Sequence, residues 1–478
     1  ENAMKMFVNG ERRTAKTQIE IRHPFDHSVI DAVPQAEAQD VADALDAAVR
    51  AAADMEKMPA HARAAILRRA ADLCEEQSES LAQTISEESG KPITEARGEA
   101  VRAAEMFRLA AFEGAQLRGE TLPLDALAVP PAEDKLGFTL PIPCGVVVAI
   151  TPFNYPSLLV MHKIAPALAA GNAVILKPAT ATPLSALRLT EIVHEAGLPP
   201  AALQCLTGGG ETVGNALCAD ARVRKISFTG SPAVGERISR IAGVKLLSLE
   251  LGSNSPCIVM PDADLEQVAA LSAVGGFVNA GQVCISMQRV LVHKTICADY
   301  LQTVRAAVEK ITVGAPNRDD TQLSAMIAEK EAVRVAEWTA EAVSAGARVV
   351  TGGEREGALM QPTIVADVSP EMKIFRDEVF GPLISVAAVD DLDEAIRLTA
   401  VGGYGLAASI FTRDVSNGLR FARTVKSGNV HINWTPLWRN DLMPYGGFGQ
   451  SGIGKEGIRS AVKSMSESKT VIIHGVPK

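Results

Sequence analysis

Short, mainly apolar runs alternate with amphipathic stretches between residues 144 and 250. Such runs are typical of parallel strands that are buried on both faces, and the stretches between them have the spacing of surface helices. The expected strands are 146–150, 173–176, 203–206, 225–228 and 245–250, and the expected helices are 157–170, 182–197, 211–219 and 232–242. This alternation predicts a doubly wound parallel sheet, in which ligands bind at the carboxyl ends of the strands.

A second alternating set follows and predicts a second α/β domain. Its expected strands are 256–260, 290–293, 348–351 and 384–389, and its expected helices are 265–280, 298–311, 329–345 and 392–399. Towards the N-terminus, residues 36–118 are rich in Ala, Leu, Glu and Arg and predict helices over 41–55, 62–83 and 93–116. Residues 119–143 are rich in proline and lack a helical period, which predicts an extended arm.

The composition indicates a soluble globular protein of two or three domains. A chain of 478 residues is too long for one ordinary compact core. Its formal net charge of −9 argues against nucleic acid or an anionic membrane as the main partner. The aromatic content of 4% disfavours a base-stacking surface.

No targeting signal is recognisable near the N-terminus. Residues 1–3 precede Met4 and are expected to be a remnant of cloning, and residues 5–10 lack the apolar core of a signal peptide. The uncharged stretch 136–161 contains four prolines, which favours a strand, a turn and a helix over a membrane-spanning helix. We therefore expect a cytoplasmic protein with no membrane partner.

The cysteines and histidines predict neither a disulfide framework nor a metal site. The chain has seven cysteines, an odd number, and none is part of a C-x-x-C motif. The eight histidines include no H-E-x-x-H motif, and no Cys/His cluster has the spacing of zinc ligands. We expect free thiols and no metal.

Two glycine-rich turns, at 208–214 and 230–235, each join an expected strand to an expected helix. Such turns direct backbone N–H groups at anions, so phosphate binding and an ordinary turn both stay open. Neither turn has the G-x-G-x-x-G pattern of common dinucleotide sites. The stretch 449–455 matches G-x-x-x-x-G-K, but Glu456 stands where a P-loop needs Ser or Thr, and no strand precedes it. We therefore exclude a P-loop nucleotidase.

Four chemically capable side chains lie at strand ends or in adjacent turns: Asn154, Lys177, Glu250 and Cys284. Each alone is open to an ordinary explanation, such as a helix cap for Asn154 or a small buried residue for Cys284. They occur within stretches that resemble the aldehyde dehydrogenase superfamily over nearly the whole chain. The seven stretches, in order, are TPFNYP (151–156), KPA (177–179), FTGS (228–231), ELG (250–252), GQVC (281–284), EVFGP (378–382) and PYGGF (444–448).

The resemblance implies the roles of the catalytic residues. Cys284 would attack the aldehyde carbon, and the Asn154 amide together with the Cys284 backbone N–H would hold the oxyanion. Transfer of a hydride to the nicotinamide would leave a thioester, which water activated by Glu250 would hydrolyse. A CoA-acylating member and a catalytically silent structural member are the alternatives. The combination of Cys284, Glu250 and Asn154 argues against both.

The resemblance also implies NAD or NADP as the cofactor. Lys177 would contact the adenosine ribose, Ser231 the pyrophosphate, and Glu378 and Phe380 the nicotinamide ribose. The remaining expected cofactor-binding residues are Thr151, Pro152, Thr180, Gly210 and Gly230. Strict NAD enzymes of the superfamily often carry Glu where this chain has Thr180. Without that carboxylate a 2′-phosphate would not be repelled, so we expect NADP to be accepted.

The resemblance places four residues around the substrate: Arg108, His162, Trp434 and Arg439. Guanidinium and imidazole donors would suit a small polar or anionic aldehyde, such as phosphonoacetaldehyde, glyceraldehyde 3-phosphate, lactaldehyde or succinate semialdehyde. The alternative is that both arginines are solvated or pair with Asp441 and other carboxylates.

Three units are implied, together with a homodimer or homotetramer. An NAD(P)-binding domain would comprise residues 4–118 and 140–250, and a catalytic domain residues 251–440. A small β oligomerisation arm would combine residues 119–139 with residues 458–478. The expected fold is thus two doubly wound α/β domains, one of them Rossmann-like, with a β arm.

Overall fold

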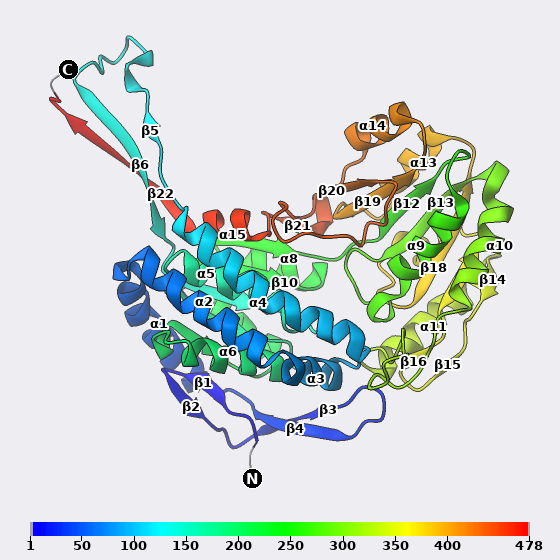
Figure 1. Ribbon diagram of the computed structural model, residues 1–478, viewed down its shortest axis with the longest axis horizontal. Helices are drawn as coiled ribbons and strands as arrows, with labels where there is room; N and C mark the ends of the chain where they lie inside the picture. The colour runs from blue at the N-terminus through cyan, green and yellow to red at the C-terminus, as the bar shows by residue number, and fades with distance from the viewer. Residues whose placement is uncertain (1–2, 477–478) are drawn as a thin grey trace.

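The computed structural model describes residues 3–476, which form two α/β units and a projecting β arm (Figure 1). Each unit is built around its own sheet and has its own apolar core. The predicted fold, two α/β units with parallel sheets and a small β extension, is confirmed.

The first sheet has eight strands, of which the central five are parallel. In spatial order the strands are β2 (Glu11–Arg13), β1 (Met6–Val8), β9 (Leu203–Cys205), β8 (Ala173–Lys177), β7 (Val146–Ile150), β10 (Lys225–Thr229), β11 (Leu246–Glu250) and β21 (Gly452–Ile453). The chain order runs outward from β7 in one direction and then resumes on its other side at β10. This reversal creates a switch point at the carboxyl ends of β7 and β10, where doubly wound sheets bind ligands.

Helices cover this sheet in two layers. Helices α5 and α6 pack on the strands, and α2, α3 and α4 lie over them. The helices of this unit are α1 (Ala38–Lys57), α2 (Ala60–Glu76), α3 (Ser78–Ser89), α4 (Ile93–Ala115), α5 (Leu158–Ala169), α6 (Leu184–Glu195), α7 (Asn215–Ala219), α8 (Pro232–Ile241) and α15 (Ile458–Ser464). Because α5 is sandwiched between the sheet and α4, all twelve of its residues are buried.

The second sheet has seven strands, all parallel except for β14 at one edge. In spatial order they are β14 (Arg348–Thr351), β17 (Thr363–Ala366), β18 (Leu383–Val389), β13 (Met287–His293), β12 (Ser255–Val259), β19 (Ala407–Phe411) and β20 (Asn429–Ile432). The helices are α9 (Leu265–Phe277), α10 (Cys297–Val308), α11 (Glu329–Ser344), α12 (Lys373–Arg376), α13 (Leu392–Thr399) and α14 (Val415–Thr424).

The arm is a three-stranded antiparallel sheet of β5 (Thr121–Leu122), β6 (Lys135–Pro143) and β22 (Ser466–His474). It projects away from both units in Figure 1. The expected C-terminal range of the arm, 458–478, includes α15, whose buried face packs on α4 and α5 in the first unit. Two small hairpins complete the strands: β3 (Gln18–Arg22) with β4 (Val29–Pro34), and β15 (Arg355–Glu356) with β16 (Leu359–Met360).

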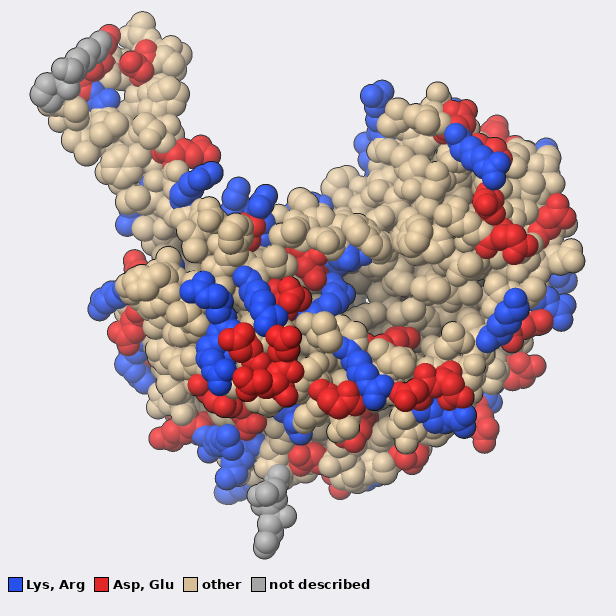
Figure 2. All heavy atoms as spheres, in the orientation of Figure 1, with Lys and Arg blue, Asp and Glu red and all other residues tan. Residues whose placement is uncertain are grey.

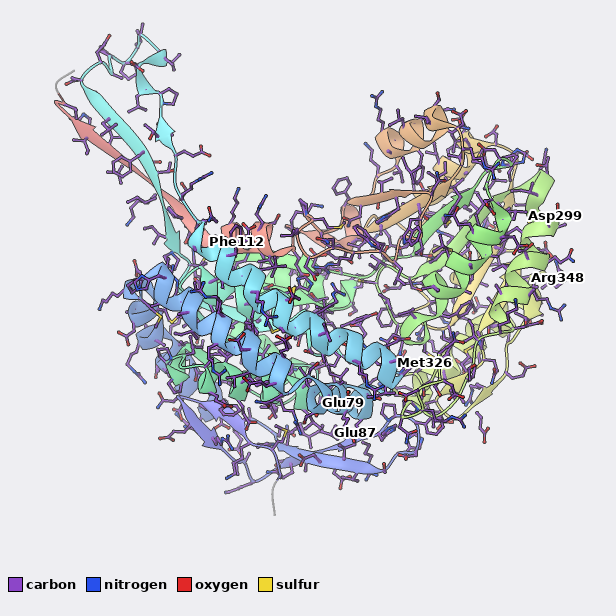
Figure 3. The ribbon with its side chains drawn as sticks, viewed as in Figure 1. Glu79, Glu87, Phe112, Asp299, Met326 and Arg348 are labelled. Atoms are coloured by element: carbon purple, nitrogen blue, oxygen red, sulfur yellow. The ribbon has the colours of Figure 1, made fainter. Side chains whose placement is uncertain are left out.

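Helix α4 joins the two units and the arm. At its N-terminal end, the Ile93 backbone N–H donates to the Pro316 carbonyl at 2.8 Å, and Arg97 pairs with Asp319 at 2.6 Å. Figure 3 shows this end beside Met326 of the second unit, and the other end of the helix, with Phe112, at the base of the arm. The first turn of α4 therefore lies against both halves of the molecule.

Candidate active site

One pocket, with a volume of about 320 Å³, contains the expected nucleophile. Asn154 reaches it from the turn between β7 and α5, Cys284 from the segment after α9, and Arg439 from the loop after β20. Its remaining lining residues are mostly apolar: Arg102, Tyr155, Leu158, Leu159, Leu271, Val274, Val283, Ile285, Trp434, Thr435, Leu437, Trp438 and Tyr445. The structure thus brings together Cys284, Asn154, Trp434 and Arg439.

A run of left-handed backbone leads to Cys284. Asn279, Ala280 and Gly281 have φ values of 50°, 53° and 68°. Left-handed backbone costs non-glycine residues free energy and persists where the surroundings enforce it. Glycine is required at 281, because a Cβ there would lie 2.0 Å from the Gly381 carbonyl oxygen. This tight passage turns the chain out of α9 and presents Cys284 to the pocket.

The Cys284 thiol contacts one other polar side chain. Its Sγ lies 3.2 Å from the Tyr445 hydroxyl, and the Arg439 guanidinium lies 3.7 Å above the Tyr445 ring. Burial raises the pKa of the Cys284 thiol to about 12, against the opposing effect of the Tyr445 hydrogen bond. A protonated thiol is a weak nucleophile, so attack on a carbonyl requires its deprotonation.

Asn154 is buried, with its side-chain amide directed at the segment that carries Cys284. The Asn154 Nδ2 donates to the Gln282 carbonyl at 2.8 Å. This bond uses one of the two N–H groups of the amide and fixes its orientation. The Asn154 Oδ1 is buried and has no hydrogen-bond partner within residues 3–476.

Glu250 ends β11 as a buried carboxyl group, only 3% exposed. Neither of its side-chain oxygens has a hydrogen-bond partner in the described part of the chain. Burial, together with the nearby charge of Glu456, raises the pKa of Glu250 well above its ordinary value. Room for the carboxyl group is left by Gly446, where a Cβ would lie 2.8 Å from Glu250 Oε1. A buried carboxyl group of raised pKa has the properties of a general base.

Glu456 is the acidic neighbour of Glu250 and is held in the charged form. Its side chain lies 2.7 Å from Lys163 and 3.3 Å from Arg439; Lys163 and Glu456 are buried, and the Arg439 side chain is 9% exposed. Burial opposes ionisation, but these cations lower the pKa of Glu456 to about 2. The two carboxyl groups thus have opposite pKa shifts. Of the two, Glu250 holds a proton more readily than an ordinary glutamate, and Glu456 less readily.

Three expected cofactor residues follow the carboxyl ends of β7 and β8, beside the switch point of the first sheet. Lys177 is 3% exposed, its Nζ donates to the Pro178 carbonyl at 2.8 Å, and burial lowers its pKa to about 8. The Thr180 hydroxyl donates to the Gly208 carbonyl at 3.1 Å. The Thr151 hydroxyl is buried and has no partner among residues 3–476. The Lys177 amine can donate hydrogen bonds to a ribose hydroxyl or to a phosphate on the ribose, and the neutral Thr180 beside it would repel neither.

The remaining cofactor candidates lie near the carboxyl ends of β10 and β11 or approach from the second unit. Ser231 caps α8, where a helix N-terminus can hold an anion, and the Gly230 N–H donates to the Glu250 carbonyl at 3.0 Å. The Glu378 carboxylate accepts from the Ser253 N–H at 2.8 Å, and burial raises its pKa to about 7. Phe380 packs edge-to-face on Phe153, with ring centroids 5.9 Å apart.

Gly210 and Pro152, the last two expected cofactor-binding residues, lie in two different turns of the first unit. Gly210 opens a π-helical turn, Gly210–Gly214, before α7. Pro152 directly follows Thr151 after β7. A Cβ at Gly214 would be 3.7 Å from the Lys177 side chain, so this turn packs beside the lysine. The residues present therefore fit a dinucleotide that crosses the switch point towards the pocket.

His162 lies behind the pocket wall and not on its surface. The Arg439 Nη2 donates to His162 Nδ1 at 3.2 Å, while His162 Nε2 lies 3.3 Å from Asp441. Burial and the positive charge of Arg439 lower the pKa of His162 to about 4, so the ring is neutral. His162 therefore supports Arg439 from behind. Arg439 Nε is buried and lacks a hydrogen-bond partner in the part of the chain described.

Arg108 does not reach the pocket, contrary to expectation. Its guanidinium lies on the outer face of α2 and α4, where it pairs with Asp72, Glu75 and Glu105. Figure 2 shows acidic and basic side chains close together over that face. The pocket instead contains Arg102, whose guanidinium pairs with Asp441 at 2.6 Å. Residues six apart differ in direction by roughly 240° on a helix, so only one of the two arginines can face the pocket.

The sequence hypothesis also missed Tyr445 as a contact of Cys284, although Tyr445 lies within the quoted PYGGF stretch. Among residues 3–476, no group of three or more His, Cys, Asp or Glu side chains is arranged to hold a metal ion. None of the helices described is both long enough and apolar enough to cross a membrane.

Several known proteins are similar to this chain over nearly its whole length. The model of the aldehyde dehydrogenase family matches residues 11–471. The 3-sulfolactaldehyde dehydrogenase of Priestia aryabhattai is 42% identical over 471 residues, 98% of each chain. The aldehyde dehydrogenase 21 of Physcomitrella patens, solved with the reaction product succinate, is 37% identical with a TM-score of 0.96 and covers 99% of this chain and 98% of its own. The NADP-dependent glyceraldehyde-3-phosphate dehydrogenase of Bacillus halodurans C-125, solved with NADP, is 35% identical with a TM-score of 0.97 over 100% of both chains.

Proposed function

The chain belongs to the aldehyde dehydrogenase family and is an NAD(P)-dependent aldehyde dehydrogenase, and on this premise we propose that Cys284, Asn154 and Glu250 carry out its reaction. The observation that supports these roles most is the pocket itself. It joins a thiol and a buried amide, and the carboxyl group of Glu250, which has no hydrogen-bond partner among the residues described, is close enough to affect the Cys284 pKa.

In the first half of the reaction, the Cys284 thiol releases its proton to solvent, and the thiolate sulfur bonds to the aldehyde carbon while the carbonyl electron pair moves to the oxygen. The Asn154 amide and the Cys284 backbone N–H donate to the oxygen that becomes negative. NAD or NADP, when bound, accepts the hydride that leaves the substrate carbon. In the second half, Glu250 takes a proton from the water that attacks the thioester on Cys284, and the carboxylic acid leaves. The raised pKa of Glu250 makes its carboxylate a stronger base than an exposed one.

The environment of Lys177 and Thr180 supports use of NADP as well as NAD. We expect Thr180→Glu to lower kcat/KM for NADP at least about tenfold, because a carboxylate would repel the 2′-phosphate. The measurement is kcat/KM with each cofactor at a fixed aldehyde concentration. Thr180→Val is the matched control, since it removes the hydroxyl that bonds Gly208 without adding charge. A wild-type enzyme that rejects NADP, with a ratio unchanged by Thr180→Glu, would show that position 180 is not the selector.

For the substrate, we infer a short aldehyde with an anionic tail. The relatives named above act on a sulfonate-bearing aldehyde, yield succinate or act on a phosphorylated aldehyde. The pocket of this chain is small and contains two guanidinium groups, Arg102 and Arg439. The Arg439 Nε–H is a buried donor with no acceptor within residues 3–476, and buried donors gain most from an added acceptor. Succinate semialdehyde, glyceraldehyde 3-phosphate, phosphonoacetaldehyde, lactaldehyde and 3-sulfolactaldehyde form the test panel.

Loss of either pocket arginine is expected to reduce the preference for anionic aldehydes. Arg439→Met should lower kcat/KM for the best anionic aldehyde about 10–100-fold more than for propanal, because a charge-assisted hydrogen bond is lost. Arg102→Met should act in the same direction. Arg108→Met is the control, since its guanidinium pairs only with surface carboxylates. Long apolar aldehydes that outperform the whole panel, or an unchanged ratio in both variants, would contradict an anion-binding pocket.

We propose a cytoplasmic homodimer or homotetramer in which the β5–β6–β22 arm contributes to assembly. The arm projects from the body and exposes Leu136, Leu140, Ile472 and Ile473. Apolar side chains exposed in this way are typical of surfaces that bind another chain. The domain boundaries proposed from the sequence, 4–118 with 140–250 and then 251–440, are kept in this proposal.

A further inference from the structure

A fully buried lysine lies directly beneath the Asn154 turn. Lys91 occupies the break between α3 and α4, and its side chain has no exposed surface. Its ammonium group donates to the Asn154 backbone carbonyl at 2.8 Å and lies 3.7 Å above the ring of Tyr155. Burial of an ammonium group is costly unless every proton finds an acceptor. The acceptors of the Lys91 ammonium group are the backbone carbonyl of Asn154 and the carboxylate of Glu99.

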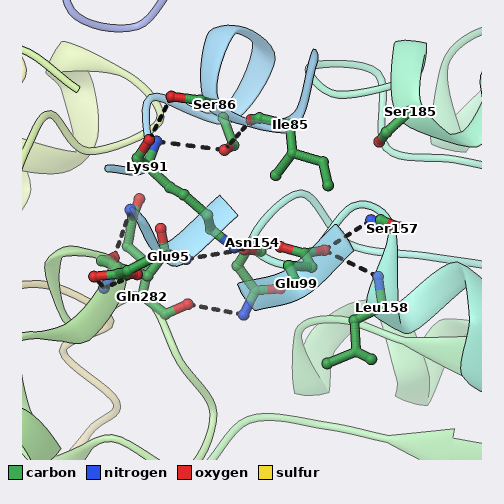
Figure 4. A network of polar contacts seen from close by, with 12 residues as sticks. Ile85, Ser86, Lys91, Glu95, Glu99, Asn154, Ser157, Leu158, Ser185 and Gln282 are labelled. Carbon is green, nitrogen blue, oxygen red and sulfur yellow. Dashed lines mark hydrogen bonds and ion pairs between the residues drawn. The ribbon is translucent and has the colours of Figure 1, made fainter. Parts of the chain in front are cut away.

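Glu99 extends this contact to α5. Its carboxylate lies 2.5 Å from the Lys91 ammonium and accepts hydrogen bonds from the backbone N–H groups of Ser157 and Leu158, each at 2.9 Å. These N–H groups open α5, so the carboxylate also satisfies the start of that helix. The chain on both sides of the turn, at Asn154 and at Ser157, is therefore held by the single ion pair of Lys91 with Glu99 (Figure 4).

The first turn of α4 also holds the segment that presents the nucleophile. The Glu95 carboxylate accepts from the Asn279 N–H at 3.0 Å, and the Asn279 side-chain amide donates to the Asn154 carbonyl at 2.9 Å. Gln282 links the same segment to the Asn154 side chain, because its carbonyl accepts from Asn154 Nδ2. Figure 4 shows Lys91, Glu95 and Glu99 together with Asn154 and Gln282. The Asn154 carbonyl thus receives two donors, from different segments of the chain.

We propose that Lys91 is a positioning residue for the oxyanion-binding amide of Asn154. The Lys91–Glu99 pair fixes the backbone of the Asn154 turn from below, while Gln282 fixes the amide from the side. Together they set the direction in which the second N–H of the amide faces the pocket. A donor must be placed within a fraction of an ångström of a developing oxyanion to be effective, so a relaxed turn reduces the rate of attack without weakening aldehyde binding. This inference rests on the proposed role of Asn154.

A double-mutant cycle tests the inference. Lys91→Met and Asn154→Ala are made singly and together, and the rate of NADPH formation in a single turnover is measured with propanal and saturating NADP. Propanal is the probe because it has no anionic tail, so the result is independent of Arg102 and Arg439. Asn154→Ala is expected to lower this rate about 10²–10³-fold. Lys91→Met is expected to lower it about 10–100-fold in the wild-type background but less than about threefold when Asn154 is already alanine.

The matched control is Glu88→Gln. Glu88 is a fully buried carboxyl group on the neighbouring helix α3, and it accepts from the N–H groups of Leu184 and Ser185 at the start of α6. It resembles Glu99 in burial and in its role at a helix start, but it contacts no pocket residue. Glu88→Gln should lower the melting temperature and leave the single-turnover rate unchanged.

Each outcome separates the two proposals. An Asn154→Ala enzyme with the wild-type rate overturns the role of Asn154 itself. A slow Asn154→Ala enzyme, combined with an equal effect of Lys91→Met in both backgrounds, overturns only the positioning role of Lys91. A rise in the KM for propanal with no change in the single-turnover rate does so too. If Lys91→Met does not fold, Glu99→Gln takes its place in the cycle, since it removes the charge that holds Lys91 and is expected to act in the same direction.

Discussion

Cys284→Ala is expected to abolish aldehyde oxidation, with kcat/KM lowered at least about 10⁴-fold. Alanine cannot form the covalent bond to the aldehyde carbon, and no other thiol lines the pocket. The measurement is NADPH or NADH formation at saturating cofactor, with succinate semialdehyde and propanal as substrates. Because Cys284 packs against a small apolar cluster with Tyr445 and not in the large core of either unit, the variant should fold and melt close to the wild-type temperature.

Cys297→Ala provides the control for this prediction. Cys297 begins α10 in the second unit and is the other cysteine that is not fully buried. Its loss should leave kcat/KM within about twofold of wild type, since surface substitutions away from a site have small effects. If activity survived Cys284→Ala but fell in Cys297→Ala, Cys284 would not be the nucleophile.

Glu250→Gln is expected to separate the two halves of the reaction. The first turnover should still produce NADPH rapidly, because attack by Cys284 does not need the carboxylate in the proposed mechanism. Steady-state kcat should fall about 10²–10⁴-fold, because the amide cannot take a proton from the hydrolytic water. Rapid-mixing absorbance at the nicotinamide band measures both phases. Loss of the burst along with kcat would show that Glu250 acts before the thioester forms.

The dependence of kcat on pH provides a second test of Glu250 as the general base. Burial and Glu456 raise the pKa of Glu250, and the deprotonated carboxylate is the active form of a base. Deacylation should therefore increase with pH through a pKa well above that of an ordinary glutamate, and Glu250→Gln should remove this limb. Glu113→Gln is the control, since Glu113 is also buried but pairs with Arg459, and neither residue lines the pocket. A limb that persists in Glu250→Gln belongs to another group.

The central strands of both sheets could be predicted from the sequence because their residues are buried on both faces. The stretch 146–150, for example, corresponds to β7 residue for residue. The N-terminal strands β1 to β4 are short or partly exposed, so their patterns gave no prediction. One expected helix, 62–83, is divided at Gln77, where the backbone leaves the helical region between two polar stretches.

The residues of the site could be predicted where they lie at strand ends, because strand ends meet at one edge of a sheet. Glu250 ends a strand, Asn154 follows one, and Cys284 lies beyond helix α9. All three were selected because their stretches resemble the aldehyde dehydrogenase superfamily, and their roles stay predictions. The prediction that Arg108 faces the pocket was wrong. On helix α4 the side chain that points towards the pocket is Arg102, and Arg108 points to the outer face. Lys91 gave no signal at all. Its importance depends on a contact with Asn154, 63 residues away, that only the folded chain reveals.

The most direct measurement is the mass of the intact Glu250→Gln protein after brief reaction with succinate semialdehyde and NADP. The account predicts an added succinyl group, and peptide mapping should place it on Cys284, because oxidation has occurred and hydrolysis has not. The adduct should be absent without NADP and absent when Cys284→Ala is combined with Glu250→Gln. An adduct on another cysteine, or no adduct in an enzyme that still forms NADPH in a burst, would contradict a thioester on Cys284 that Glu250 helps to hydrolyse.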